Sequence, residues 1–136
     1  MSDWVPQRGG TLLMPSGTNQ DPERRHLFII CTNPDNDGQV LLVSISSKPE
    51  GYSESYDATC SLKQNAHAFL NRTSYVSYKH ALIESASALQ KRVANGTAEP
   101  REELRPPILE EVCAGFAKSA VTPRKCQILY EQNKSR

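Results

Sequence analysis

The first 84 residues alternate between short apolar runs and polar segments rich in turn residues. Short apolar runs of strand-forming residues, bounded by turns, predict buried β-strands. Polar segments such as "SGTNQDPERR" and "NPDNDG" are dense in Gly, Pro, Asn and Asp and predict loops. The apolar runs predict five strands, at "TLLMP" (11–15), "HLFIICT" (26–32), "QVLLVSIS" (39–46), "ATCSL" (58–62) and "SYVSYKHALIE" (74–84).

The pattern changes to helical spacing after residue 84. The segment "SASALQKRVANG" (85–96) predicts a short helix with Ser85 as N-cap and Gly96 after its end. The segment "PPILEEVCAGFAKSA" (106–120) has proline at its start and apolar residues at spacings of three and four, which predicts an amphipathic helix. In the tail, "CQILY" predicts a final edge strand. The segment "KQNAHAFLNRT", before the last long strand, is interpreted as a loop or a single helical turn.

Strands in meander order followed by helices predict a mainly β fold with C-terminal α-helices, built on a small barrel or curled sheet. A Rossmann-like sheet would need helices between successive strands, and the connections are too short or too turn-rich for them. We expect one domain, divided into a flexible arm (1–8), a β-barrel core (9–83), a helical region (84–120) and a tail or edge strand (121–136).

Composition narrows the classes of protein. The formal net charge is +1, so a nucleic-acid site must be a local patch. No apolar run is long enough to span a bilayer, and the N-terminus lacks the basic and apolar segments of a secretory signal. The four cysteines show no CxxC spacing, so we expect reduced thiols in the cytoplasm, with no metal and no cofactor. A thiol or metal site at Cys60 and His67 is disfavoured because sequence proximity alone does not define such a pair.

Three potential phosphate-binding residues, Arg24, Arg25 and His26, stand directly before the apolar run "LFIICT". The planar guanidinium of arginine binds phosphate oxygens in pairs and stays charged. The simplest alternative is that these charges solvate the end of a buried strand.

Four stretches in this order, "RGGTLLMPSG", "RRHLFIICT", "LLVSISS" and "SYVSYKHALI", resemble the PemK/MazF family of toxin ribonucleases over roughly residues 8–83. The resemblance implies an SH3-like β-barrel acting as a bacterial, metal-independent endoribonuclease, often a homodimer, that an antitoxin protein neutralises. It places the family's arginine at Arg25 and its Thr or Ser at Ser46 or Ser47. The chain departs from the family pattern with His26 in place of proline, serines in place of a Thr-Thr pair, and a longer C-terminal region.

Metal-free cleavage of RNA needs a base near the 2′-hydroxyl, an acid near the leaving 5′-oxygen, and a cation for the phosphorane. Arg25 is the candidate cation and His26 the candidate base or acid. Ser46 and Ser47 are candidates for binding the phosphate or orienting the 2′-hydroxyl, and Asp57 for orienting a base or holding Arg25. The alternatives are strand-end capping for the serines and a turn residue for Asp57.

Aromatic residues next to cations are typical of single-stranded RNA binding. Tyr75, Tyr78 and Lys79 meet this description, with Arg24 as a further phosphate contact. Strand alternation points one tyrosine inward, so at most one is a stacking platform. Two functions therefore stay open: an endoribonuclease acting on single-stranded RNA, or a non-catalytic SH3-like module that binds a protein partner or nucleic acid.

Overall fold

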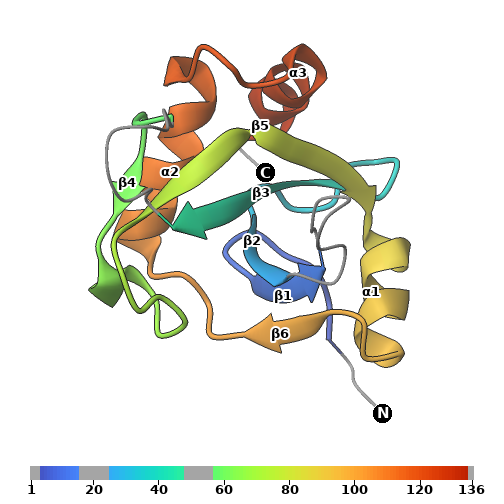
Figure 1. The fold of residues 1–136 in the computed structure, drawn as a ribbon. Helices are drawn as coiled ribbons and strands as arrows, with labels where there is room; N and C mark the ends of the chain where they lie inside the picture. Colours follow the sequence, from blue (N-terminus) through green and yellow to red (C-terminus); the bar gives the residue numbers. More distant parts are fainter. Residues whose placement is uncertain (1–3, 16–24, 48–56, 135–136) are drawn as a thin grey trace.

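A curled sheet of six antiparallel strands dominates the structure (Figure 1). The computed structural model describes residues 4–15, 25–47 and 57–134. The strand order is β4-β5-β3-β2-β1-β6, and the sheet forms a half-barrel. The predicted mainly β fold is therefore confirmed. The strands are β1 (Thr11–Pro15), β2 (Arg25–Ile30), β3 (Gln39–Ser47), β4 (Ser61–Leu62), β5 (Ser74–Ser85) and β6 (Glu99–Arg101).

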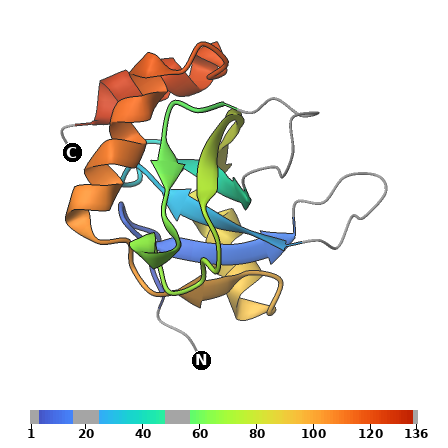
Figure 2. The same cartoon turned by 60° about the vertical axis from the view of Figure 1, so that its left-hand side comes forward.

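Helices cover both faces of this sheet. The helices are the 3₁₀ turn η1 (Gln64–Ala66) and the α-helices α1 (Ala86–Ala94), α2 (Pro106–Lys118) and α3 (Arg124–Asn133). Helices α2 and α3 lie together on one side of the sheet, as Figure 2 shows, and α1 packs on the other face. Of the helices within the described residues, none is long and apolar enough to cross a membrane.

The continuous apolar run in β2 follows from this two-sided cover. Leu27 and Ile29 belong to the core cluster beneath α2 and α3. Phe28 and Ile30 belong to a second cluster, which includes Leu89 of α1. Because successive side chains of a strand point to opposite faces, a strand buried on both sides must be apolar at every position.

Strand β5 bends sharply in its middle (Figure 1). Leu42 of β3 pairs with Leu82, whereas Ser44 pairs with Ser77, so residues 78–81 all lie opposite one residue of β3. Extra residues in one strand of a pair disrupt the ladder and bend the strand. The bend lets β5 pair along both halves of β3 and curls the sheet.

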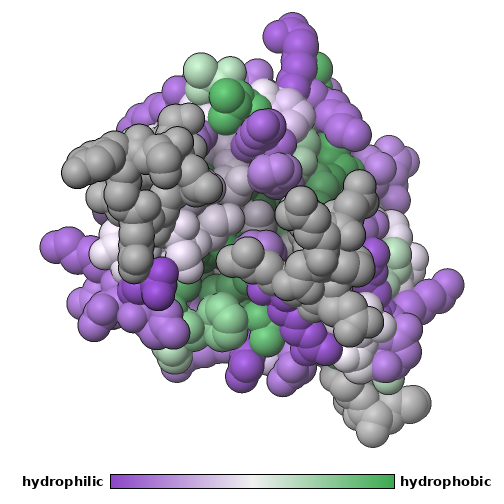
Figure 3. Space-filling view, in the orientation of Figure 1, coloured by the Kyte–Doolittle hydropathy of each residue, from purple (hydrophilic) through white to green (hydrophobic). Residues whose placement is uncertain are grey.

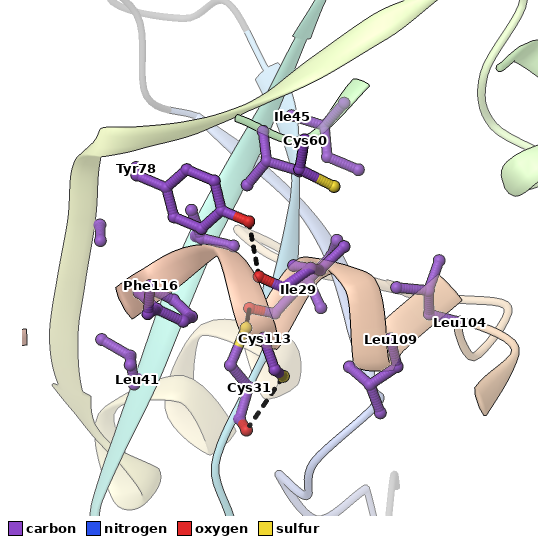
Figure 4. Close-up of a cluster of buried hydrophobic side chains, with 14 of the residues drawn as sticks. Ile29, Cys31, Leu41, Ile45, Cys60, Tyr78, Leu104, Leu109, Cys113 and Phe116 are labelled. Atoms are coloured by element: carbon purple, nitrogen blue, oxygen red, sulfur yellow. Dashed lines mark hydrogen bonds between the residues drawn. The ribbon is translucent and has the colours of Figure 1, made fainter. Parts of the chain in front are cut away.

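The packing beneath α2 is close (Figure 4). Tyr78 is fully buried, and its hydroxyl donates a hydrogen bond to the carbonyl oxygen of Val112 at 2.5 Å. Its ring meets that of Phe116 edge to face, with 5.2 Å between centroids. A methyl group added at Gly115 would overlap the Tyr78 hydroxyl. The glycine therefore provides the room in α2 that the tyrosine occupies.

The tail differs from the prediction, because "CQILY" lies in helix α3 rather than in an edge strand. Cys126, Leu129 and Asn133 are buried, at spacings of three and four, so they share one helical face. Cys126 and Leu129 join the core cluster beneath α2, a contact that the alternating faces of a strand would not allow. The sixth strand, β6, was also not predicted, and it pairs with the outer edge of β1.

Candidate functional site

Arg25 and Ser47 lie at the same end of the β2–β3 ladder. The ladder's last pair at this end is Leu27 with Ile45, and Arg25 and Ser47 each lie two residues beyond it. By strand alternation both share a face with Leu27. They line a pocket of about 90 Å³, which we call the Arg25 pocket. Its polar and aromatic lining residues are Arg25, His26, Ser47, Phe69, Asn71 and Ser74.

The Arg25 guanidinium is accessible. Its Nη1 donates a hydrogen bond to Glu99 Oε2 at 3.0 Å, and the two side chains are 40% and 53% exposed. Exposed ion pairs contribute at most about 1 kcal/mol to stability, because water screens both charges. Arg25 can therefore exchange the carboxylate of Glu99 for a phosphate at small cost.

The hydroxyl groups near Arg25 are not equivalent. Ser74 is buried, and its Oγ donates to the carbonyl oxygen of Arg72 at 3.1 Å. Ser47 is exposed and lines the pocket. Ser46 lies on the opposite face of β3, because successive residues of a strand alternate, and it pairs with Tyr75. Of the two candidate serines, only Ser47 therefore lines the Arg25 pocket.

His26 also lines the Arg25 pocket, although it follows Arg25 within β2. Successive residues of a strand point to opposite faces, so two neighbours within a strand would not normally line one pocket. Strand β2 begins at Arg25, and the two residues meet at its open end. Arg24, the other candidate phosphate ligand, lies outside the described residues.

Asp57 belongs to a different pocket. This Asp57 pocket measures about 560 Å³ and is lined by Asp57, Thr59, Tyr75, Ser77, Lys79, His80 and Lys118, among others. The Asp57 carboxylate accepts hydrogen bonds from the hydroxyl groups of Ser119 and Thr59, both at 2.5 Å, and from the Thr59 backbone N–H at 3.0 Å. Burial alone would raise the pKa of Asp57, but these hydrogen bonds outweigh it and lower the pKa. Asp57 thus ties the start of β4 to the end of α2.

The predicted RNA-binding residues of β5 are separated by burial. Tyr75 is half-buried and Lys79 is exposed, and both line the Asp57 pocket. Tyr78 lies in the core with no exposed surface, and burial raises the pKa of its hydroxyl. The prediction that Tyr78 binds RNA is therefore wrong, because no base can reach its ring.

Cys60 and His67 do not form a nucleophile and base pair. Burial raises the pKa of the Cys60 thiol. His67 Nδ1 accepts a hydrogen bond from the backbone N–H of Phe69 at 2.9 Å, so its proton lies on Nε2, which is 2.5 Å from the carbonyl oxygen of Glu102. Both ring nitrogens are thus engaged with the backbone. All four cysteines are free and buried.

Four polar or aromatic residues of the Arg25 region were missed from the sequence: Phe69, Asn71, Ser74 and Glu99. Phe69 is 40% exposed and lies in the segment interpreted as a loop or helical turn. The available signal was that Phe69 is the one Phe, Tyr or Trp in that segment. Glu99 gave no signal, because its position beside Arg25 depends on the unpredicted strand β6.

The fold resembles that of a chain in solved MazE–MazF structures. The chain is similar to a chain in crystal structures of MazE–MazF from Deinococcus radiodurans, with TM-scores of 0.52 in form III and 0.50 in form II. Each match has 18% sequence identity and covers 85% of this chain and 95% of the other. The sequence matches no protein-family model and no curated protein. The chain thus has a MazF/PemK-like fold, as the resemblance of its sequence implies.

Proposed function

We propose that the protein is a metal-independent endoribonuclease that cleaves single-stranded RNA. The observation that carries this proposal is the meeting of Arg25, His26 and Ser47 at one small pocket, built from the ends of β2, β3 and β5. The MazF/PemK-like fold supports the same reading.

In the proposed reaction, the 2′-oxygen of one nucleotide attacks the adjacent phosphorus and forms a new P–O bond. The bond from phosphorus to the 5′-oxygen of the next nucleotide breaks. A base takes the proton of the 2′-hydroxyl, and an acid gives a proton to the leaving 5′-oxygen. The products are a 2′,3′-cyclic phosphate and a free 5′-hydroxyl. The transition state carries extra negative charge on the phosphate oxygens, and this charge is what the protein must stabilise.

Arg25 is the group we assign to that charge. Its guanidinium is exposed at the pocket, and among the described residues its ion-pair partner is the exposed carboxylate of Glu99. His26 is the titratable lining residue that we assign as base or acid, because its ordinary pKa lies near neutrality. We assign the exposed Ser47 hydroxyl to bind a phosphate oxygen or the 2′-hydroxyl, because it lines the same pocket. Ser46 and Asp57 lie away from this pocket, and we assign them no chemical step.

The matched crystal structures contain MazE together with MazF. We extend this to the present chain as a proposal: an antitoxin protein binds it, and two copies form a dimer. The reduced, buried thiols fit the expected cytoplasmic location.

The test is an RNA-cleavage assay with purified protein in EDTA, comparing the native chain with Arg25→Ala and Arg25→Lys. We expect cleavage that leaves 2′,3′-cyclic phosphate ends. Arg25→Ala should lower the rate by about 10²- to 10³-fold, the usual cost of removing one group that stabilises transition-state charge. Arg25→Lys should be intermediate, since it keeps the charge and loses the planar fork.

The matched control is Arg124→Ala, which removes an exposed arginine from α3, and it should leave the rate unchanged. Equal cleavage by Arg25→Ala and the native chain would contradict the assignment of Arg25. A folded native protein that cleaves no RNA would contradict the endoribonuclease proposal and favour a non-catalytic binding module of the same fold.

A further inference from the structure

The Arg25 pocket is too small for a nucleotide. Its volume of about 90 Å³ is well below the roughly 300–1,000 Å³ that small-molecule sites usually measure. A phosphate bound to Arg25 must therefore leave its sugar and base outside. A second hollow, of about 470 Å³, shares the side chain of Phe69 with the Arg25 pocket. We propose that Phe69 and Arg101 in this hollow form a stacking subsite for a base of single-stranded RNA, next to the phosphate at Arg25. The inference rests on the proposed function for its substrate.

Phe69 has the exposure and the neighbour that such a platform needs. Its side chain is 40% exposed, and it lines both hollows. The guanidinium carbon of Arg101 lies over its ring, 5.7 Å from the centroid. An aromatic ring beside a cation holds single-stranded nucleic acid by stacking on a base and by neutralising a phosphate.

His67 holds Phe69 and Arg101 in their relative positions through two hydrogen bonds to the backbone. The buried imidazole accepts the backbone N–H of Phe69 and donates to the carbonyl oxygen of Glu102, the residue after Arg101. One side chain thus joins the loop that carries Phe69 to the edge strand that carries Arg101. Thr11 Oγ1 also donates to the Glu102 carbonyl, at 2.8 Å. The two halves of the subsite are therefore held together before any ligand binds, which lowers the entropic cost of binding.

The residues that line the hollow suit a polar, stacked ligand. Figure 3 shows one face of the molecule, on which polar side chains predominate and apolar ones reach the surface in small groups. Glu102 lines the hollow as well and supplies a hydrogen-bond acceptor for base amino groups. Tyr75, the accessible aromatic residue of the predicted RNA-binding set, lines the Asp57 pocket instead. Phe69, unlike Tyr75, lines the Arg25 pocket, so its ring lies where a base next to the bound phosphate could stack.

The test uses binding rather than cleavage. The probe is a fluorescein-labelled 2′-O-methyl RNA 10-mer of mixed sequence, which cannot be cleaved because its 2′-oxygens are blocked. Fluorescence anisotropy gives Kd for the native chain, Phe69→Ala, Phe69→Trp and Arg101→Gln. Phe69→Ala should weaken binding by about 5- to 150-fold, the usual loss for one stacked base, while Phe69→Trp should retain it. Arg101→Gln should lower the slope of log K against log salt by about 0.7, the value for one phosphate contact on a single strand.

The matched control is Ile128→Ala, which removes a side chain of similar exposure, 45%, from α3 and should leave Kd unchanged. A second probe lacks its bases and keeps its backbone. With this abasic strand, the native chain and Phe69→Ala should bind equally, because no base is present to stack. Thermal melting followed by circular dichroism checks that each variant is folded.

The outcomes separate this inference from the proposed function. Native-like binding of the 10-mer by folded Phe69→Ala overturns the stacking subsite, even if the native chain cleaves RNA. An equal loss on the abasic strand overturns it as well, because the effect would then not depend on a base. No measurable binding of the 10-mer by the native chain also overturns it. Phe69-dependent binding without cleavage of any RNA supports the subsite and contradicts the endoribonuclease proposal.

Discussion

The middle and the start of strand β5 are built in opposite ways. Beneath α2, Tyr78 has no exposed surface, its hydroxyl is bonded to Val112, and Gly115 leaves no spare room. At the start of β5, the Arg25 pocket opens to solvent, and Arg25 and Glu99 are each more than a third exposed. Close packing in the first region stabilises the fold. In the second region, Arg25 stays accessible and can exchange the carboxylate of Glu99 for a phosphate.

This difference predicts which substitutions should affect stability and which should affect binding or rate. Changes beneath α2 should lower the free energy of unfolding and leave the chemistry of the folded fraction intact. Changes at the Arg25 pocket should alter ligand binding or rate and leave stability almost unchanged, because exposed side chains contribute little to it. The following variants test that separation.

Gly115→Ala should give the largest loss of stability. The added methyl group overlaps the Tyr78 hydroxyl and ring, and both partners lie in a packed layer that cannot give way. Overpacking of this kind typically costs about 1–3 kcal/mol, and we expect the upper end or more. Urea unfolding followed by circular dichroism measures it. Tyr78→Leu shortens the opposing side chain, so adding Gly115→Ala to that variant should cost less than adding it to the native chain. Equal costs in both backgrounds would contradict the proposed overlap.

The strands were predictable from the sequence because they depend on local patterns. The run "LFII" (27–30) is apolar at every position, and both faces of β2 are covered as the run predicts. Helix α1 begins after its predicted N-cap, with Ser85 Oγ accepting the N–H of Ala88. Strand β6 was not predictable in this way. Its residues "EPR" are all exposed and form a strand only because β1 offers a free edge.

The position of Arg25 at a strand opening could be read from the sequence, but its surroundings could not. Alternation predicted the burial of one tyrosine in β5 and did not identify which one. Tyr78 is buried because it lies at the bend, directly beneath Gly115. Phe69 and Glu99 reach the Arg25 region through contacts between segments far apart in the chain, which local patterns do not encode.

Asp57→Ala should have an intermediate effect on stability. The substitution removes an acceptor of three hydrogen bonds that ties β4 to the end of α2, and we expect a loss of about 1–2 kcal/mol at pH 7. The pKa of Asp57 is lowered in the folded state, so its contribution is present above the unfolded value of about 3.9 and is lost as the pH falls through the folded value. The free energy of unfolding of the variant and of the native chain should be measured at pH 7 and below pH 3.9. The difference between the two proteins should be smaller at the lower pH. A difference that grows at acid pH would contradict the lowered pKa.

Glu99→Gln should have the smallest effect and should act on binding alone. Removing the carboxylate frees Arg25 from a competing ion pair, so the uncleavable RNA 10-mer should bind about two- to fivefold more tightly. The melting temperature should stay nearly the same. Weaker binding by the variant would mean that Glu99 positions Arg25 for phosphate rather than competing with it. Arg8→Gln, which removes an ion pair to Glu110 at a different place, is the control.

The pairing of β1 with β6 has a consequence for synthesis on the ribosome. Strand β2, one partner of β1, is complete once Ile30 has been made. The other partner, β6, is complete only at Arg101. At roughly 5–20 residues per second, translation of the intervening stretch takes on the order of 4–14 s. Until then the outer edge of β1 carries unpaired backbone groups, which is the kind of edge that recruits strands from other chains. The nascent chain is therefore most exposed to misassembly in the seconds before three residues, Glu99 to Arg101, emerge and close that edge.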